Sequence, residues 1–329
     1  MSSKPGAMIV ATGRGVPERR LTNFDLEKIV DTSDKWIRER SGISERRIAA
    51  EGEVTSDIGA KAAMAALNKA NVSPEEVDVI IVATITGDMP FPSTACFVQQ
   101  KIGAQNAAAF DISAACSGFI YGLKVAEGLI CSGTAKNIVV IGAEVLSRLT
   151  DYTDRNTCVL FGDGAGAALL QPSNGTQGII GSYWKSDGNL TELLYLPGGL
   201  SRYPASHQTV DDRLHFLKMA GREVFKYAVN AMSGAAIHIL EETGLSGSDI
   251  DLLIPHQANI RIIKATAEKA KIPMEKVVVN LDRYGNTSAG SIPIALDEAI
   301  EAGRVKPGMK ILIVAFGGGF TWGSAIIQF

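Results

Sequence analysis

The sequence contains few cysteines and few histidines, 4 of each among 329 residues. The cysteines (Cys96, Cys116, Cys131 and Cys158) form no Cys-x-x-Cys pair and show no metal-ligand spacing. Disulfide frameworks and zinc sites depend on such spacings. We therefore expect no metal site, and the small number of cysteines suits the reducing cytoplasm.

Long hydrophobic runs and an excess of charge of one sign are also absent. No uninterrupted apolar run approaches the roughly 18 residues of a membrane span. The first residues, MSSKPGAMIVATGRG, lack the apolar length and the cleavage site of a signal peptide. With 32 basic and 35 acidic residues, the formal net charge is −3. We therefore predict a cytoplasmic protein with neither nucleic acid nor membrane as its partner.

The sequence does contain alternating strand and helix patterns. A helix is predicted over residues 56–70, with Ser56 or Asp57 as its N-cap, and a long amphipathic helix over 222–242, ending near Gly244. Apolar, β-branched runs predict strands buried on both faces. These runs cover residues 77–84, 137–143, 166–170, 251–255, 276–280, 310–316 and 324–329. This alternation predicts an α/β fold.

The two halves of the chain resemble each other. Three segments of the first half have counterparts in the same order in the second. The pairs are 71–83 with 244–256, 136–144 with 309–317, and 161–170 with 320–329. Unrelated βαβ proteins yield single matches of this kind, but a conserved order is harder to obtain by chance. We therefore predict two similar halves, residues 1–175 and 176–329, packed about a pseudo-twofold axis.

The repeat also isolates a candidate site. CSGFIYGLKVAEGLICSG (116–133) aligns without a gap with NTSAGSIPIALDEAIEAG (286–303), which places Cys116 opposite Asn286. His256 follows the predicted strand 251–255. Ligands of α/β folds bind where strands end and helices begin. We therefore expect Cys116, His256 and Asn286 to lie near one another.

Cys116 has the sequence context of a nucleophile. Small residues flank it, and it precedes a predicted helix over 117–131, whose free N–H groups and dipole favour a thiolate. A thiolate is the form that attacks an acyl group. The alternative is a buried structural cysteine, which we favour for Cys96, Cys131 and Cys158.

The other motifs have structural alternatives as well. His256 is compatible with an ordinary loop histidine, and Asn286 with a turn residue that caps a helix. The glycines at 317–319 permit backbone N–H groups to face a developing oxyanion, or they form a tight turn. GDGAG (162–166) precedes a predicted strand, so we interpret it as a closely packed turn and not as a phosphate loop.

Taken in order, AACSGF, HQAN, GNTSAGS and FGGGFTWGS resemble the β-ketoacyl-acyl-carrier-protein synthase III family. The resemblance extends from WIRERSGISERR (36–47) to the C-terminus. It implies a homodimeric thiolase fold, with two pseudo-symmetric βαβαβαββ halves in a five-layered α-β-α-β-α arrangement. It also implies a cofactor-free condensation of an acyl-CoA, acetyl-CoA in the first instance, with malonyl-acyl-carrier protein.

The resemblance implies a role for each site residue. Cys116 accepts the acyl group, while His256 and Asn286 hold the malonyl thioester oxygen as CO2 leaves. The N–H groups of Cys116 and Gly318 form the oxyanion hole. Coenzyme A and substrate contacts fall on Trp36, Arg40, Arg155, Phe161, Gly221, Arg222 and Phe225. Arg222 stands where family members often carry asparagine, which leaves its contact open.

Two further contacts are implied at the surface. Phe91 reaches the acyl pocket of the partner subunit, and Gln257, Arg261, Lys226 and Lys269 contact the acidic carrier protein. The alternatives are that Trp36 and Phe91 belong to the core and that the basic residues form a solvated helix face. Residues 185–217 are irregular, and we interpret them as loops that cover the site.

Other functions fit the sequence less well. A specialised-metabolite condensing enzyme or an acyltransferase would use the same three residues, and acyl and acceptor preference would separate them. A papain-like protease also has Cys, His and Asn in this order, but the signature around its cysteine is missing. A non-catalytic scaffold that binds acyl groups or carrier protein is the alternative of another class.

Overall fold

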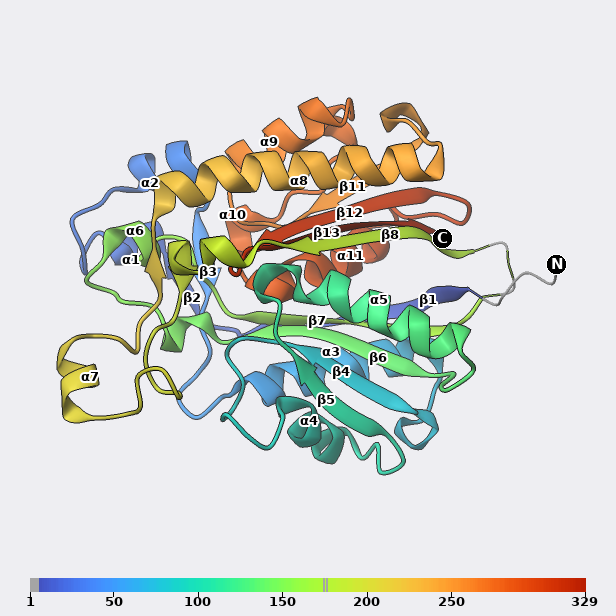
Figure 1. The fold of residues 1–329 in the computed structure, drawn as a ribbon, viewed down its shortest axis with the longest axis horizontal. Helices are drawn as coiled ribbons and strands as arrows, with labels where there is room; N and C mark the ends of the chain where they lie inside the picture. The colour runs from blue at the N-terminus through green and yellow to red at the C-terminus, as the bar shows by residue number, and fades with distance from the viewer. Residues whose placement is uncertain (1–5, 174, 176) are drawn as a thin grey trace.

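Two β-sheets, one above the other, form the centre of the molecule in the computed structural model, which describes residues 6–173, 175 and 177–329 (Figure 1). The first sheet has the order β1-β7-β6-β4-β5 and the second β11-β12-β13-β8. The first contains β1 (Ala7–Gly15), β4 (Val79–Ala83), β5 (Ala108–Ile112), β6 (Ile138–Glu144) and β7 (Gly164–Pro172). The second contains β8 (Gly178–Ser186), β11 (Leu252–Pro255), β12 (Lys310–Gly317) and β13 (Thr321–Gln328).

Helices fill three layers around these sheets (Figure 1). The outer layers are α3 (Thr55–Ala70) with α4 (Thr94–Ile102), and α8 (Gly221–Thr243) with α9 (Ile260–Lys269). Between the sheets lie α5 (Gly118–Cys131) and α11 (Ser291–Glu301). Separate clusters of buried residues join the outer helices to each sheet and the inner helices to both. The predicted α-β-α-β-α arrangement is therefore confirmed.

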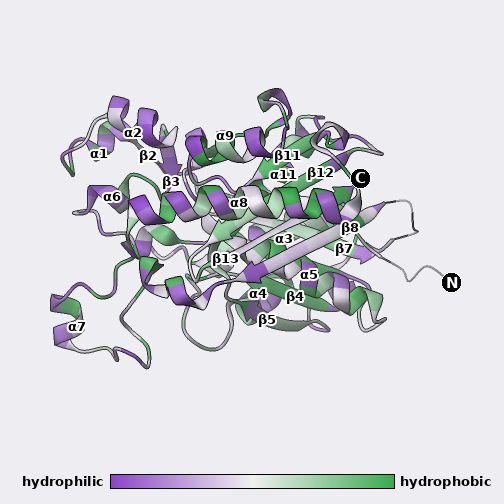
Figure 2. Cartoon of the chain, turned by 45° about the horizontal axis from the view of Figure 1, so that its top comes forward, coloured by the Kyte–Doolittle hydropathy of each residue, from purple (hydrophilic) through white to green (hydrophobic). Residues whose placement is uncertain are grey.

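The surfaces of the layers follow from the sequence patterns. Figure 2 shows the inner helix α5 and strand β4 as mainly hydrophobic, whereas the outer helix α8 carries hydrophilic turns. Strand β6 is buried along its whole length, as expected for a strand with helices on both faces. An amphipathic outer helix buries one stripe of apolar residues and leaves the other face in water.

The two sheets have matching topology. In each, a parallel pair (β4 and β6, β11 and β12) is followed by two strands that each run antiparallel to the strand before, β7 then β1 and β13 then β8. The first sheet has one further parallel strand, β5, beside β4, whereas β11 is the edge of the second sheet. The predicted strand 276–280 is an exception, because only Val277 forms a bridge, to Leu253. The chain passes between the sheets after Pro172, and the predicted boundary at 175/176 adjoins residues 174 and 176, which lie outside the described residues.

The predicted helix boundaries are nearly correct. Helix α8 ends before Gly244, which adopts a left-handed φ of 69° as a C-terminal glycine commonly does. Helix α3 begins one residue earlier than predicted, and its N-cap is Val54. The carboxyl group of Asp57 instead accepts a hydrogen bond from the Val54 N–H. Asp57 thus satisfies a free N–H from inside the helix.

Short elements complete the fold beside the large layers. They are β2 (Arg20–Thr22), α1 (Asn23–Leu26), α2 (Asp34–Ser41), β3 (Glu45–Arg47), α6 (Arg155–Cys158), β9 (Leu194–Tyr195), α7 (His207–Asp211), β10 (Lys218–Met219) and α10 (Leu281–Tyr284). Segment 185–217, predicted as irregular loops, contains the end of β8, the strand β9 and the helix α7. It contributes Leu194, Tyr195, Leu196 and Leu217 to the lining of an inner cavity. Within the described ranges, no helix combines the length and apolar character needed to cross a bilayer.

Candidate active site

Cys116 lies in a short 3-10 turn, η2 (Ala115–Ser117), that leads into α5. The turn is tied to the second sheet, because the Ser117 hydroxyl donates to the Thr321 carbonyl (3.1 Å) and the Thr321 hydroxyl donates to the Ala114 carbonyl (2.8 Å). Cys116 is 7% exposed. The nucleophile candidate is therefore held where the two sheets meet.

A second turn, η7 (Ser288–Gly290), leads into α11 in the same way. Ala115 and Ser288 have nearly the same left-handed φ, 45° and 47°, although neither is glycine. These two residues are therefore structural counterparts, and Cys116 corresponds to Ala289, three positions from the predicted partner Asn286. The ungapped alignment is wrong here because α11 has 11 residues and α5 has 14.

The three predicted catalytic side chains share one cavity despite that shift. Cys116, His256 and Asn286 line a narrow space of about 100 Å³, together with Phe316 and Gly317 at the end of β12. The cysteine comes from the η2 turn, the histidine follows β11, and the asparagine precedes η7. The structure thus brings together residues that lie far apart along the chain.

His256 is buried and neutral. Its Nδ1 lies 2.7 Å from the Ser291 hydroxyl oxygen, and that oxygen also accepts the Gln257 N–H at 3.4 Å. We assign the serine hydroxyl as the donor to Nδ1, which places the ring proton on Nε2. Burial lowers the pKa of His256 to about 3. The imidazole is a neutral hydrogen-bond donor over the whole physiological pH range.

Asn286 is oriented by its own turn. Its Oδ1 accepts the Ser288 N–H at 2.8 Å, so the amide offers its Nδ2 hydrogens as donors. The Asn286 backbone is held as well, since its N–H donates to the Leu160 carbonyl and its carbonyl accepts the Gly162 N–H. Asn286 is therefore fixed at both its backbone and its side chain.

The thiol of Cys116 differs from its sequence-based expectation. The pKa of this thiol is raised to about 12, chiefly by burial; the Ser288 hydroxyl opposes the rise, and the charge of Glu144 contributes to it. Burial therefore disfavours the resting thiolate that the sequence context predicts. The proton must leave Cys116 when the sulfur reacts.

Glycines bring the end of β12 against the nucleophile. A Cβ atom at Gly317 would lie 2.6 Å from the backbone nitrogen of Cys116, and one at Gly318 would lie 2.8 Å from the Leu194 carbonyl. Gly318 lines the same inner cavity as Cys116. Only glycine permits this approach of the backbone, which is the kind of packing that an oxyanion hole needs.

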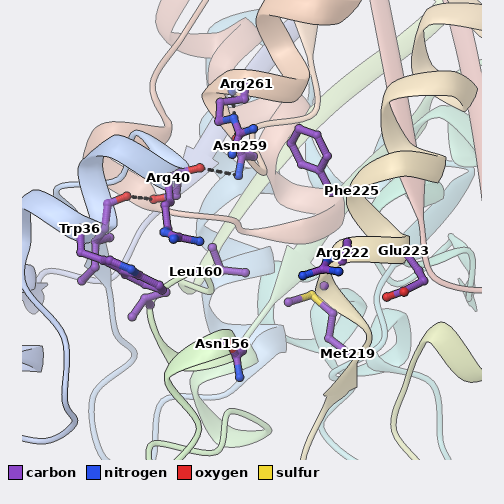
Figure 3. A pocket seen from close by; sticks show the side chains of 14 residues that line it. Trp36, Arg40, Asn156, Leu160, Met219, Arg222, Glu223, Phe225, Asn259 and Arg261 are labelled. Atoms are coloured by element: carbon purple, nitrogen blue, oxygen red, sulfur yellow. Dashed lines mark hydrogen bonds between the residues drawn. The ribbon is translucent and has the colours of Figure 1, made fainter.

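A larger cavity of about 770 Å³ adjoins the narrow one, and the two share Leu160, Met219 and Phe225 in their linings. Figure 3 shows Trp36 and Arg40 of α2 on one side of it and Arg222 and Glu223 of α8 on the other. Gly221, Phe225 and Arg261 also line it, with the Arg261 guanidinium 4.9 Å from the Phe225 ring centre. The Trp36 ring lies 4.8 Å from the Arg40 guanidinium and 5.2 Å from that of Arg155.

The remaining predicted site residues lie elsewhere. Phe161 lines the narrow cavity and a further one of about 350 Å³ beyond Cys116, and not the outer cavity. Phe91 is 83% exposed. The structure contradicts the predicted carrier-protein contact of Gln257, which is 1% exposed. Its side chain bonds to the backbone of Pro255, Val278 and Asn280.

Comparisons with known proteins agree with this geometry. The family described as "3-Oxoacyl-[acyl-carrier-protein (ACP)] synthase III" matches residues 110–188, and its C-terminal counterpart matches residues 240–329. A β-ketoacyl-[acyl-carrier-protein] synthase III of Caldanaerobacter subterraneus is 56% identical over 328 residues, covering 100% of this chain and 99% of the relative. This chain belongs to the β-ketoacyl-acyl-carrier-protein synthase III family.

Further similarities to this family extend over the same length. A synthase III of Clostridioides difficile is 51% identical over 100% of this chain and 99% of its own. The crystal structure of 3-oxoacyl-[acyl-carrier-protein] synthase III from Aquifex aeolicus has a TM-score of 0.91 and 52% identity, covering 98% of this chain and 100% of that one. The fold is therefore the thiolase fold, and the protein is a condensing acyltransferase of fatty acid biosynthesis.

Sequence reasoning missed three residues of this site. Ser288 and Ser291 lie inside the GNTSAGS segment, and Glu144 lies at the end of an otherwise apolar strand. A carboxyl group after six apolar or small residues was the signal for Glu144. Its contacts with the site, however, depend on segments brought together by folding.

Proposed function

We propose that this protein condenses an acyl-CoA primer with malonyl-acyl-carrier protein, giving β-ketoacyl-acyl-carrier protein, coenzyme A and CO2. Acetyl-CoA is the first primer to test. The observation that carries the proposal is the shared cavity of Cys116, His256 and Asn286. It combines one nucleophile with two neutral hydrogen-bond donors, which is the set that a decarboxylative condensation requires.

The first half-reaction acylates Cys116. Its sulfur attacks the thioester carbonyl, the N–H groups of Cys116 and Gly318 stabilise the tetrahedral oxyanion, and the coenzyme A thiolate leaves. In the second half-reaction, His256 Nε2–H and Asn286 Nδ2–H donate to the malonyl thioester oxygen as CO2 is lost. The carbanion then attacks the acyl-cysteine and expels its sulfur. These steps require no cofactor, but they require an acceptor for the thiol proton of Cys116.

The direct experiment is to incubate the purified protein with acetyl-CoA, measure its intact mass, and then add malonyl-acyl-carrier protein. We expect a single acetyl adduct, followed by CO2 release and a β-ketoacyl product. The cavity of about 350 Å³ beyond Cys116 has an apolar lining that includes Leu146, Leu149 and Leu217. It has more room than an acetyl group fills, so longer and branched acyl-CoAs belong in the same panel. Acylation without condensation would favour a specialised enzyme, and no acylation would favour a scaffold.

The outer cavity is the proposed path of coenzyme A. An aromatic ring flanked by two guanidinium groups suits adenine and phosphates. Trp36→Ala should raise KM for acetyl-CoA roughly tenfold and leave kcat with saturating substrate nearly unchanged. Initial rates against acetyl-CoA concentration measure both values. A fall in kcat alone would place Trp36 in the chemical step.

The proposed docking surface for the carrier protein is the basic face formed by Lys226, Arg261 and Lys269. All three are exposed on the neighbouring helices α8 and α9. Arg261→Glu should raise KM for malonyl-carrier protein by about three- to tenfold at low salt, and less at high salt, because salt screens exposed charges. KM for acetyl-CoA is measured beside it. Lys306→Glu, an exposed change outside the outer cavity, is the matched control and should change neither value.

Three further proposals concern the whole protein. Phe91 is 83% exposed beside Met89 at 48%, and such an apolar patch supports a homodimer in which Phe91 reaches the partner's acyl pocket. The matching topology of the two sheets supports the division into halves 1–175 and 176–329. The four cysteines show no disulfide framework in their spacing, as is usual for proteins of a reducing compartment, and this supports a cytoplasmic location.

A further inference from the structure

Glu144 is a fully buried carboxyl group, and the reaction as described gives it no role. It ends β6, and its oxygens lie 2.6 Å from the Thr86 hydroxyl and 3.2 Å from the Thr84 hydroxyl. Each hydroxyl oxygen already accepts a backbone N–H. The Val145 N–H donates to the Thr86 hydroxyl, and the Thr86 N–H donates to the Thr84 hydroxyl. Both threonine hydrogens are therefore directed to the carboxylate, which also accepts the Ile85 N–H.

A further hydroxyl connects this carboxylate to the nucleophile. Ser288 Oγ lies 3.0 Å from Glu144 Oε1, and Ser288 and Cys116 line the same inner cavity, where the turns η2 and η7 pack against each other. At this contact the Ser288 hydroxyl lowers the pKa of the Cys116 thiol. The Ser288 backbone is held in place by its N–H, which donates to Asn286 Oδ1. The cysteine S–H can thus donate to the serine oxygen while the serine O–H donates to the carboxylate. Cys116, Ser288 and Glu144 form a continuous path for a proton.

The proposed function leaves the proton of Cys116 without an acceptor. His256 already carries its ring proton on Nε2, and its Nδ1 is occupied by Ser291. We propose that Glu144 is the proton acceptor for Cys116 and acts through the hydroxyl of Ser288. This inference rests on the proposed role of Cys116 as the nucleophile. Glu144 and Ser288 are positioning residues in this scheme, since neither touches the acyl carbon.

The proton movements balance over the cycle. As the sulfur bonds to the acyl carbon, the S–H proton passes to Ser288 Oγ and the serine hydroxyl proton passes to Glu144 Oε1. The carbon–sulfur bond to coenzyme A breaks, and the released thiolate takes a proton from solvent. During condensation Cys116 leaves as a thiolate and regains its proton by the reverse path. The cycle takes up one proton, as decarboxylation of a malonyl carboxylate requires.

The electrostatics of the site place a single negative charge on this pair. The hydrogen-bond partners of Glu144 from the loop after β4 and from η7 are all uncharged, and Cys116 is the ionisable group on η2 that its charge affects. Burial raises the pKa of Glu144 to about 7, still far below that of the thiol, so the carboxylate is the base at rest. Neutralising Glu144 removes the repulsion that opposes a thiolate, and the start of α5 favours charge on the sulfur.

The test is the pH dependence of Cys116 acetylation in a single turnover, followed by intact mass from about pH 5 to about pH 9. The parent rate should fall as the pH decreases through the pKa of Glu144, because a protonated carboxyl group cannot accept the proton. Glu144→Gln keeps a hydrogen-bond acceptor but loses the base. Its Cys116 should be acetylated about 10²- to 10⁴-fold more slowly at neutral pH. Its pH profile should also lack the fall in rate near neutral pH, which we call the neutral limb. Ser288→Ala should behave in the same way, and alanine at position 115 already occupies the equivalent backbone conformation.

Two further measurements separate this role from a purely structural one. Thr86→Val removes the shortest hydrogen bond to the carboxylate, so the neutral limb should move to higher pH with the alkaline rate retained. Decarboxylation of malonyl-carrier protein should persist in Glu144→Gln, because His256 and Asn286 carry that step. The inference is overturned if Glu144→Gln retains the parent pH profile, or if decarboxylation falls as much as acetylation. A parent protein that accepts no acyl group would instead refute the proposed function.

Discussion

Cys116→Ala is expected to abolish acetylation of the protein and to lower condensation by about 10⁴-fold or more, as loss of a covalent nucleophile does in other enzymes. The substitution removes the sulfur that forms the acyl-enzyme, and the cavity contains no second thiol among the residues that line it. Intact mass after incubation with acetyl-CoA measures the first effect. Formation of β-ketoacyl product measures the second.

Cys96→Ala is the matched control for this prediction. Cys96 is partly exposed, and its sulfur contacts only Ser93 and the Ala109 carbonyl among its described hydrogen-bond partners. A thiol that simply reacts with thioesters in solution would be lost in this variant, whereas acetylation at Cys116 would remain. An acetyl adduct that persists in Cys116→Ala would show that another residue is the nucleophile.

The strands that could be predicted from the sequence are those that are buried on both faces and therefore contain uninterrupted apolar runs. Strand β6 is the clearest case, because it lies between two layers of helices and contains mostly large apolar residues. Strands β1 and β8 were missed for opposite reasons. Gly13 of β1 packs against the backbone of α3, where a Cβ atom would lie 2.3 Å from the Ala62 carbonyl oxygen. The strand is therefore buried by close backbone packing and not by large apolar side chains. Strand β8 is an edge strand that ends in exposed, polar residues.

The site was predicted from its motifs better than from its symmetry. The alignment of 116–133 with 286–303 is correct at the helix ends, where Gly133 and Gly303 both have positive φ. It fails at the helix starts, where the two turns are offset by three residues. The hydrophobic pattern of the sequence does not reveal this offset, because the shorter helix α11 still presents apolar residues to both sheets. The contact between Glu144 and Ser288 was beyond sequence reasoning because 144 positions separate them.

Asn286→Ala and His256→Ala are each expected to lower decarboxylation of malonyl-carrier protein by about 10²- to 10³-fold, the usual effect of removing one donor to a developing oxyanion. Acetylation of Cys116 should continue in both variants, because the donors act on the second substrate. Because the pKa of His256 is lowered to about 3, decarboxylation should show no loss from its protonation between about pH 8 and about pH 5. CO2 release and intact mass, measured on the same samples, separate the two half-reactions.

Ser291→Ala tests why the histidine is a donor. Without the serine hydroxyl, Nδ1 loses the group that fixes the ring proton on Nε2, so a fraction of the imidazole turns to the wrong tautomer. Decarboxylation should then fall by less than in His256→Ala, and acetylation should again persist. Loss of acetylation in any of these three variants would mean that His256 and Asn286 also serve Cys116. The two half-reactions would then share one set of residues, and the separate proton path through Ser288 would be unnecessary.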